Sequence, residues 1–145
     1  MLETESKTGL ARGSQETVFN FLSDFRNFSG LIPKERLNDF EISQEKIRFS
    51  IPGLGKVGLV IRDKKPFSEI NITATKDSTA DFTLRVNIRE TGKDQSEVKF
   101  NLKANLNIFL EMMAKVPLKQ FVDLLADKIS SVDFSQDLIT PPPEK

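Results

Sequence analysis

The stretch that decides the fold is residues 68–130, SEINITATKDSTADFTLRVNIRETGKDQSEVKFNLKANLNIFLEMMAKVPLKQFVDLLADKIS. In its first part, apolar residues alternate with polar ones in three consecutive segments, residues 70–74, 82–88 and 98–104. This period of two is typical of β-strands with one face in water and the other in a core. The second part changes to helical spacing, with apolar residues at Leu118, Phe121, Val122, Leu125 and Ile129. The order predicts an antiparallel sheet packed against a long C-terminal helix.

The preceding residues predict the other elements of the fold. Alternation favours four more strands, at residues 2–8, 40–42, 47–51 and 57–61. Pro52, Gly53 and Gly55 are typical of a hairpin turn, and residues 92–95 predict another. Two short helices are expected after the first strand, the first of them with Ser14 as its N-cap. The predicted fold class is therefore α+β, with a curved seven-stranded antiparallel sheet, two short helices after strand 1 and a long C-terminal helix.

Pro117 stands just before the clearest part of the long helix. Because proline lacks an N–H and clashes with the preceding turn, it either begins this helix or kinks it. A kink would lift the first turns away from the sheet and open the mouth of a cavity there.

The length of 145 residues fits one domain. We place this domain at residues 1–130, and we expect residues 131–145, with their three consecutive prolines, to form a flexible tail.

Composition excludes several classes of protein. The 21 basic and 21 acidic residues cancel without any block of one charge, which argues against nucleic acid as a partner. The apolar runs are too short to span a membrane. Met1 and Leu2 lead directly into acidic residues, so no secretory signal is expected and a cytoplasmic location is predicted.

The side chains that most often perform catalysis are missing. The chain has no His, Cys, Tyr or Trp, and pairs such as Asp123 and Asp127 fall on faces predicted to be wet. No spacing typical of a calcium loop is present. We therefore predict no catalytic residue, no cofactor and no metal site, although an enzymatic activity stays an open alternative.

Two segments resemble one known superfamily. Residues 18–33, VFNFLSDFRNFSGLIP, resemble the helix pair that follows strand one in START-like proteins of the SRPBCC superfamily. Residues 106–125 resemble that superfamily's C-terminal helix, in the form common among uncharacterised bacterial members. The resemblance implies a helix-grip fold with a cavity between sheet and helix. It also implies relatives that bind lipids, sterols, polyketides, quinones or plant hormones, some of them cyclases and others carriers or co-chaperones.

The apolar faces of the strands and of the long helix predict a ligand-binding chamber. We expect it to be lined by Phe49, Leu59, Ile61, Ile72, Leu84, Val86, Phe100, Leu102, Phe109, Met113, Phe121 and Leu125. The same side chains would also make an ordinary filled core, and Met112 and Met113 fit either a core or a lid. If Thr4, Ser6 and Thr8 faced inward, their hydroxyls would orient a ligand.

Three functions follow from these observations. The first is non-covalent binding of a small hydrophobic molecule such as a lipid, quinone or polyketide. The second is a protein-interaction module resembling the Hsp90-activating relatives, which would use the outer sheet face or the helix pair near Phe25 and Phe28. The third is an enzyme of the cyclase or dehydratase type, which needs an acid or base inside the chamber.

Overall fold

The computed structural model of the chain describes residues 2–32, 37–52, 55–79 and 81–134. Within these residues, no helix has both the length and the apolar character that crossing a bilayer requires. In chain order the elements are β1 (Leu2–Glu5), β2 (Gly9–Ala11), α1 (Gln15–Leu22), α2 (Phe25–Phe28), the 3-10 turn η1 (Ser29–Leu31), β3 (Asn38–Ile42), β4 (Lys46–Ile51), β5 (Gly55–Lys65), β6 (Glu69–Ala74), β7 (Asp81–Gly92), β8 (Gln95–Asn105) and α3 (Ile108–Ser130).

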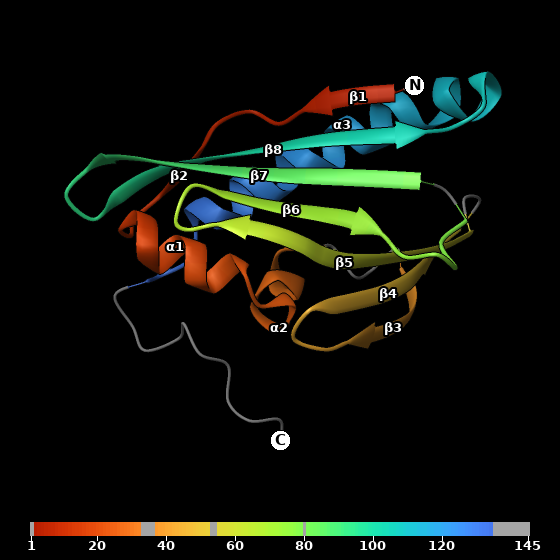
Figure 1. The fold of residues 1–145 in the computed structure, drawn as a ribbon. Helices are drawn as coiled ribbons and strands as arrows, with labels where there is room; N and C mark the ends of the chain where they lie inside the picture. The colour runs from red at the N-terminus through yellow and green to blue at the C-terminus, as the bar shows by residue number, and fades with distance from the viewer. Residues whose placement is uncertain (1, 33–36, 53–54, 80, 135–145) are drawn as a thin grey trace.

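All strands belong to one antiparallel sheet with the order β1-β8-β7-β6-β5-β4-β3, and β2 also pairs with β8 (Figure 1). Along β7, buried and exposed residues alternate as the sequence predicted. The residues of β7 that face α3 pair with those of β8, for example Val86 with Phe100 and Leu84 with Leu102. These pairs confirm the antiparallel sheet with one apolar face.

The predicted hairpin at residues 92–95 is confirmed. Gly92 pairs with Gln95, so Lys93 and Asp94 form a two-residue turn, in which Asp94 has a φ of 56°. Asp tolerates this left-handed backbone conformation better than most residues, which suits it to such turns.

The first predicted strand, residues 2–8, ends early: β1 stops at Glu5, and a second short strand, β2, begins at Gly9. Between them, the Ser6 N–H donates to the Phe100 carbonyl at 2.8 Å, and the Ser6 hydroxyl accepts from the Phe100 N–H at 2.9 Å. The Ser6 side chain thus replaces a backbone carbonyl in the ladder while the chain bulges. The phase of the alternation shifts at this break, because Lys7 and Thr8 are both exposed, and the additional strand β2 gives the described sheet eight strands where the sequence predicted seven.

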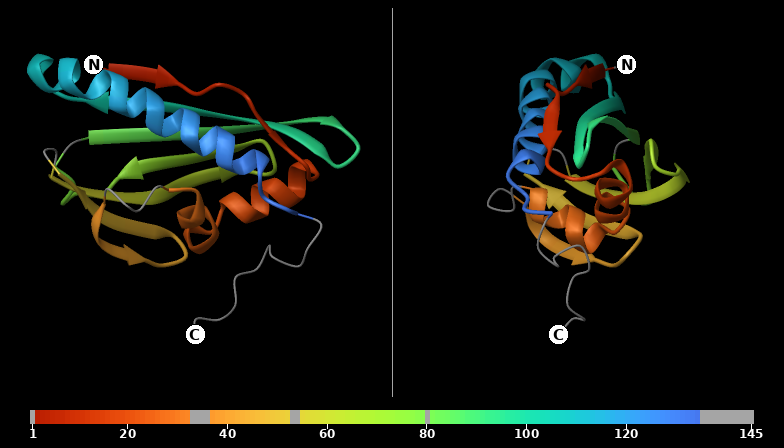
Figure 2. Two further views of the ribbon diagram at one scale, coloured as in Figure 1. Left: turned by 180° about the vertical axis from the view of Figure 1, so that it is seen from behind. Right: turned by 90° about the vertical axis from the view of Figure 1, so that its left-hand side faces the viewer.

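Helix α3 runs diagonally across one face of the sheet (Figure 2). It begins at Ile108, where the Asn107 side chain caps it by accepting from the Leu110 N–H at 2.9 Å. Pro117 lies inside the helix, nine residues after its start. The long helix therefore does not begin at this proline, and its first turns carry Phe109, Met112 and Met113.

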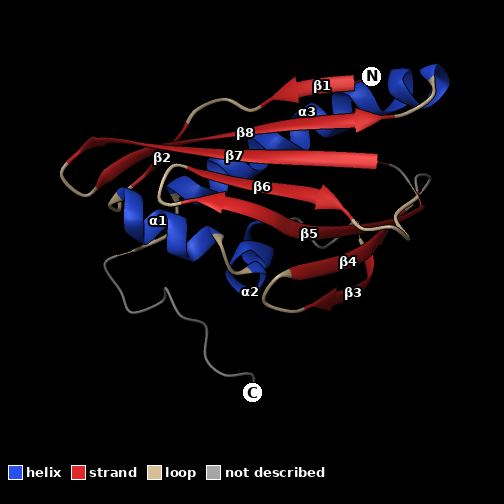
Figure 3. Cartoon of the chain, in the orientation of Figure 1, coloured by secondary structure: helices blue, strands red, loops and turns tan. Residues whose placement is uncertain are grey.

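The two short helices close one end of the sheet (Figure 3). Ser14 caps α1 as predicted, accepting from the Thr17 N–H at 3.1 Å. In α2, the side chains of Phe25 and Phe28 are buried, and the Phe25 N–H donates to the Gln44 carbonyl in the β3–β4 turn at 2.9 Å. The two rings are therefore part of the core, and a docking role for the helix pair around them stays a prediction.

Candidate functional site

The candidate site lies where the apolar face of the sheet meets α3. Eight of the twelve predicted ligand-binding residues are buried there, namely Phe49, Leu59, Ile72, Leu84, Val86, Phe100, Leu102 and Leu125. Ile61 and Phe121 are half-buried and pack against this core. The sequence therefore identified the apolar face of the sheet, although contact with a ligand stays a prediction.

Phe109 and Met113 lie elsewhere, because their side chains are 68% and 60% exposed. Met112 is also exposed, so of the two alternatives for Met112 and Met113, core or lid, the core is wrong. The reason is the rotation of α3 about its own axis. Apolar residues of its first turns fall on two opposite faces, and only one face can meet the sheet.

We call the row of α3 that is turned toward the core the inner row. Its members are Leu110, Ala114, Leu118 and Phe121, all half-buried and packed against the core cluster. The second half of the helix differs, because Val122, Leu125, Ala126 and Ile129 are almost completely buried. The helix is thus gripped at its C-terminal half and only partly covered at its N-terminal half.

The gripped half owes its burial to a close approach by β2. A Cβ placed on Gly9 would lie 2.6 Å from the Ala126 carbonyl oxygen and 2.8 Å from the Ile129 Cγ2 atom. The Leu10 N–H also donates to the Ser130 hydroxyl at 3.1 Å. A residue without a side chain at position 9 therefore lets strand and helix touch.

Aromatic rings fill the space beside this half. Phe25 meets Phe28 edge-on with ring centres 5.6 Å apart, and Phe28 meets Phe100 at 6.2 Å. Phe134 packs edge-on against Phe21 at 5.2 Å and is buried. The predicted tail, residues 131–145, thus includes one buried side chain, that of Phe134. Residues 135–145 lie outside the described residues.

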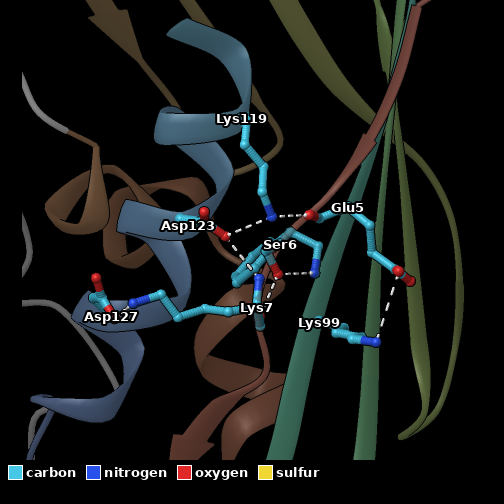
Figure 4. A network of polar contacts seen from close by, with 8 residues as sticks. Glu5, Ser6, Lys7, Lys99, Lys119, Asp123 and Asp127 are labelled. Atoms are coloured by element: carbon cyan, nitrogen blue, oxygen red, sulfur yellow. Dashed lines mark hydrogen bonds and ion pairs between the residues drawn. The ribbon is translucent and has the colours of Figure 1, made fainter. Parts of the chain in front are cut away.

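A polar network fastens the chain between β1 and β2 to α3 (Figure 4). The Lys7 N–H donates to the Asp123 carboxylate at 2.7 Å, and the Lys7 ammonium pairs with Asp127 at 2.8 Å. The Lys119 ammonium donates to the Glu5 carbonyl at 2.7 Å and to Asp123 at 3.2 Å. We call these contacts the clip. They join the helix at the boundary between its two halves.

The clip shifts the pKa of two of its members. Burial raises the pKa of Asp123, but the Lys7 N–H, the Lys119 ammonium and the two lysine charges outweigh it and leave that pKa below its ordinary value of 3.8. The hydrogen bond and charge of Asp127 raise the pKa of Lys7 above its ordinary value of 10.5. At neutral pH Asp123 and Lys7 are therefore both charged.

In the described ranges, the buried polar side chains are Ser6, Ser29 and Ser96. Each hydroxyl donates to a backbone carbonyl, namely Lys7, Arg26 and Gly13 respectively. Thr4 is half-buried and Thr8 is exposed, so the expected inward row of three hydroxyls is wrong. Because the buried hydroxyls are already bonded to backbone groups, the described core residues beside α3 present an apolar surface.

Two hollows of the described surface lie away from α3. The smaller, of about 300 Å³, is lined by Phe49, Arg48 and Asp77 among others, and Arg48 forms an ion pair with Asp77. The larger, of about 600 Å³, includes the exposed Arg89–Glu97 ion pair. No residue of α3 lines either hollow, so the chamber between sheet and helix remains a prediction.

Comparison with known proteins identifies the fold. No protein-family model matches the chain, and no curated protein matches it either. Among solved structures, a START superfamily protein from Mycobacterium smegmatis is 14% identical, with a TM-score of 0.63 over 90% of this chain and 99% of that one. The protein XoxI from Bacillus cereus is 11% identical, with a TM-score of 0.65 over 90% and 94%. The chain has the START-like fold.

A plant enzyme shares this START-like fold. Norcoclaurine synthase from Thalictrum flavum, solved in complex with dopamine and hydroxybenzaldehyde, is 10% identical, with a TM-score of 0.60 over 91% of this chain and 89% of that one. At such low sequence identity, the similarity shows a shared START-like fold and does not identify any catalytic residue in this chain.

Proposed function

We propose that this protein binds a small hydrophobic molecule, such as a lipid, quinone or polyketide, between the sheet and the first half of α3. The observation that carries the proposal is the incomplete burial of the inner row, Leu110, Ala114, Leu118 and Phe121. An apolar molecule placed against this row would remove both surfaces from water, at about 25 cal/mol per Å² of apolar area.

The surroundings of the inner row suit an apolar ligand. On the sheet, Leu59 and Leu102 keep 8% and 6% exposure, and the half-buried Ile61 packs against the same core. Phe40 stacks on Phe49 with ring centres 5.3 Å apart and extends this apolar surface toward the edge strand β3. Binding is therefore expected at the loosely covered end, where side chains can move aside at least cost.

The START-like fold supports the same class of ligand. In norcoclaurine synthase the fold accommodates small aromatic molecules. In the present chain the buried polar side chains of the described residues are already paired with backbone groups. Affinity would then come from apolar burial, and any orientation from polar groups at the rim.

A tryptophan reporter tests the proposal. The chain contains no Trp or Tyr, so Ala114→Trp places a single indole on the inner row. We expect its emission to shift when a monomeric fatty acid or a quinone analogue is added. A matched variant, Leu10→Trp, places the indole on the exposed side chain of β2 and should not respond. An unchanged Ala114→Trp emission with every apolar probe, together with no copurifying molecule in native mass spectrometry, would contradict the proposal.

A further inference from the structure

The first half of α3 carries a second apolar surface that the inner row does not explain. Five side chains on its outward side are 60–77% exposed, namely Ile108, Phe109, Met112, Met113 and Val116. Phe109, Met112, Met113 and Val116 follow the i, i+3, i+4, i+7 spacing of one helix face. We call these five residues the outer stripe. Isolated exposed apolar residues are common, but a contiguous group of this kind marks an interaction site.

The outer stripe lies back to back with the inner row. On an α-helix, Phe109 and Leu118 point in opposite directions, so this segment is apolar toward both the sheet and the solvent. Figure 2 shows that the start of α3 lies at one end of the molecule, beside the start of the chain and away from α1. A flat surface can therefore approach the stripe without meeting the short helices.

We propose that the outer stripe docks this end of the protein on the surface of a lipid bilayer. The stripe itself carries no charge, and the exposed Lys115 lies along one flank of it, as does the half-buried Glu111. Long lysine side chains in this position can lay their methylene groups on the apolar boundary while the ammonium reaches lipid phosphates.

The size of the stripe favours a bilayer over a second copy of the chain. A stable protein interface buries about 800 Å² on each partner and requires matching shapes. Five side chains on three turns of one helix supply only part of such an area. A bilayer needs no matching shape, because its acyl chains adapt to each inserted side chain.

The inference rests on the proposed function and extends it. A molecule of the apolar class proposed above resides in membranes, and the same helical segment would face the bilayer on one side and the bound molecule on the other. Docking would thus bring the loosely covered end of the protein to the source of its ligand.

Vesicle flotation tests the docking with phosphatidylcholine vesicles that contain or lack phosphatidylglycerol. We expect the full chain to float with both, and somewhat more strongly with the anionic vesicles because of Lys115. Met112→Asp should reduce the bound fraction about tenfold or more, because it places a charge in the middle of the stripe. Leu10→Asp is the matched control, since Leu10 is 61% exposed at the other end of α3 and should leave flotation unchanged.

Two further measurements separate the alternatives. Met112→Gln removes the apolar side chain without adding charge and should also weaken flotation, and thermal melting confirms that each variant is folded. A full chain that fails to float with either vesicle, or a Met112→Asp variant that floats equally well, overturns the docking. Another outcome is a dimer in sedimentation that Met112→Asp dissociates, while the chain binds no vesicles. That result assigns the stripe to contact with a second copy of the chain and likewise overturns the docking.

Failure of the proposed function has a different signature. Binding of an apolar probe by Ala114→Trp is measured without vesicles and does not depend on the stripe. Flotation without a probe response would leave a membrane-docking protein without the proposed ligand site. A probe response without flotation would leave a ligand-binding protein that does not dock.

Discussion

The two halves of α3 have similar apolar content and opposite environments. In the half from Val122 to Ile129, β2 approaches so closely that Gly9 touches the helix backbone, and the apolar residues are buried. In the half from Ile108 to Phe121, one apolar row is half-buried and the other faces solvent. The comparison teaches that apolar spacing alone does not decide burial. What decides it is whether another segment of the chain reaches the helix.

The clip marks the boundary between these regions. Lys119 and Asp123 hold the helix to the chain between β1 and β2, one turn after Pro117. Residues before the clip are free of these contacts. The structure therefore ties the gripped half to the chain between β1 and β2 and leaves the first half without these ties.

The largest effect is expected from shortening the same side chain in the two halves. Leu125→Ala removes a fully buried side chain and should lower the free energy of unfolding by about 2–5 kcal/mol. Leu118→Ala removes a half-buried side chain from the inner row and should lower it by about half as much or less. Urea denaturation measures both. Equal losses would mean that the two halves are packed alike, contrary to the comparison.

The close approach at Gly9 gives the next effect. Gly9→Ala forces a Cβ against the Ala126 carbonyl oxygen and the Ile129 side chain, and should cost about 1–3 kcal/mol of stability. Gly30→Ala is the matched control, because a Cβ there meets no atom within 4 Å. Its stability should change by less than about 1 kcal/mol. A neutral Gly9→Ala would show that β2 can move away from the helix.

The clip predicts a dependence on acid pH. Because the folded-state pKa of Asp123 lies below 3.8, its carboxylate stabilises the folded state above that pH. This stabilisation is lost as the pH falls through the folded-state pKa. Asp123→Asn should cost about 1 kcal/mol at neutral pH and flatten the loss of stability on the acid side. Asp127→Asn should have a smaller effect, since its pair with Lys7 is more exposed. If the free energy of unfolding of Asp123→Asn fell with decreasing pH in the same way as that of the unmodified chain, the clip would not contribute to stability.

The smallest effect is expected on the outer stripe. Met112→Ser should change the free energy of unfolding by no more than about 0.5 kcal/mol, because the side chain is 76% exposed. Thermal melting monitored by circular dichroism checks this. A loss comparable to that of Leu118→Ala would place Met112 in the core after all.

Much of the fold could be predicted from local patterns. The alternation at residues 82–88 and 98–104 and the turn at residues 92–95 correspond to β7, β8 and their two-residue connection. Ser14 caps α1 as expected. These predictions succeed because each feature depends on residues close together in the chain. Ile42 shows the limit, since it follows the pattern of the apolar face but is 38% exposed on the edge strand β3.

The sequence by itself determined most strands of the antiparallel sheet, their apolar face and the long final helix, because periods of 2 and 3.6 residues are local properties. Only the tertiary structure decided where α3 is gripped and which of its apolar rows meets the sheet. That outcome depends on contacts between distant residues, such as Lys7 with Asp123 and Ser6 with Phe100. Local spacing carries no information about them, because the same apolar row can cover a core, a ligand or a lipid surface.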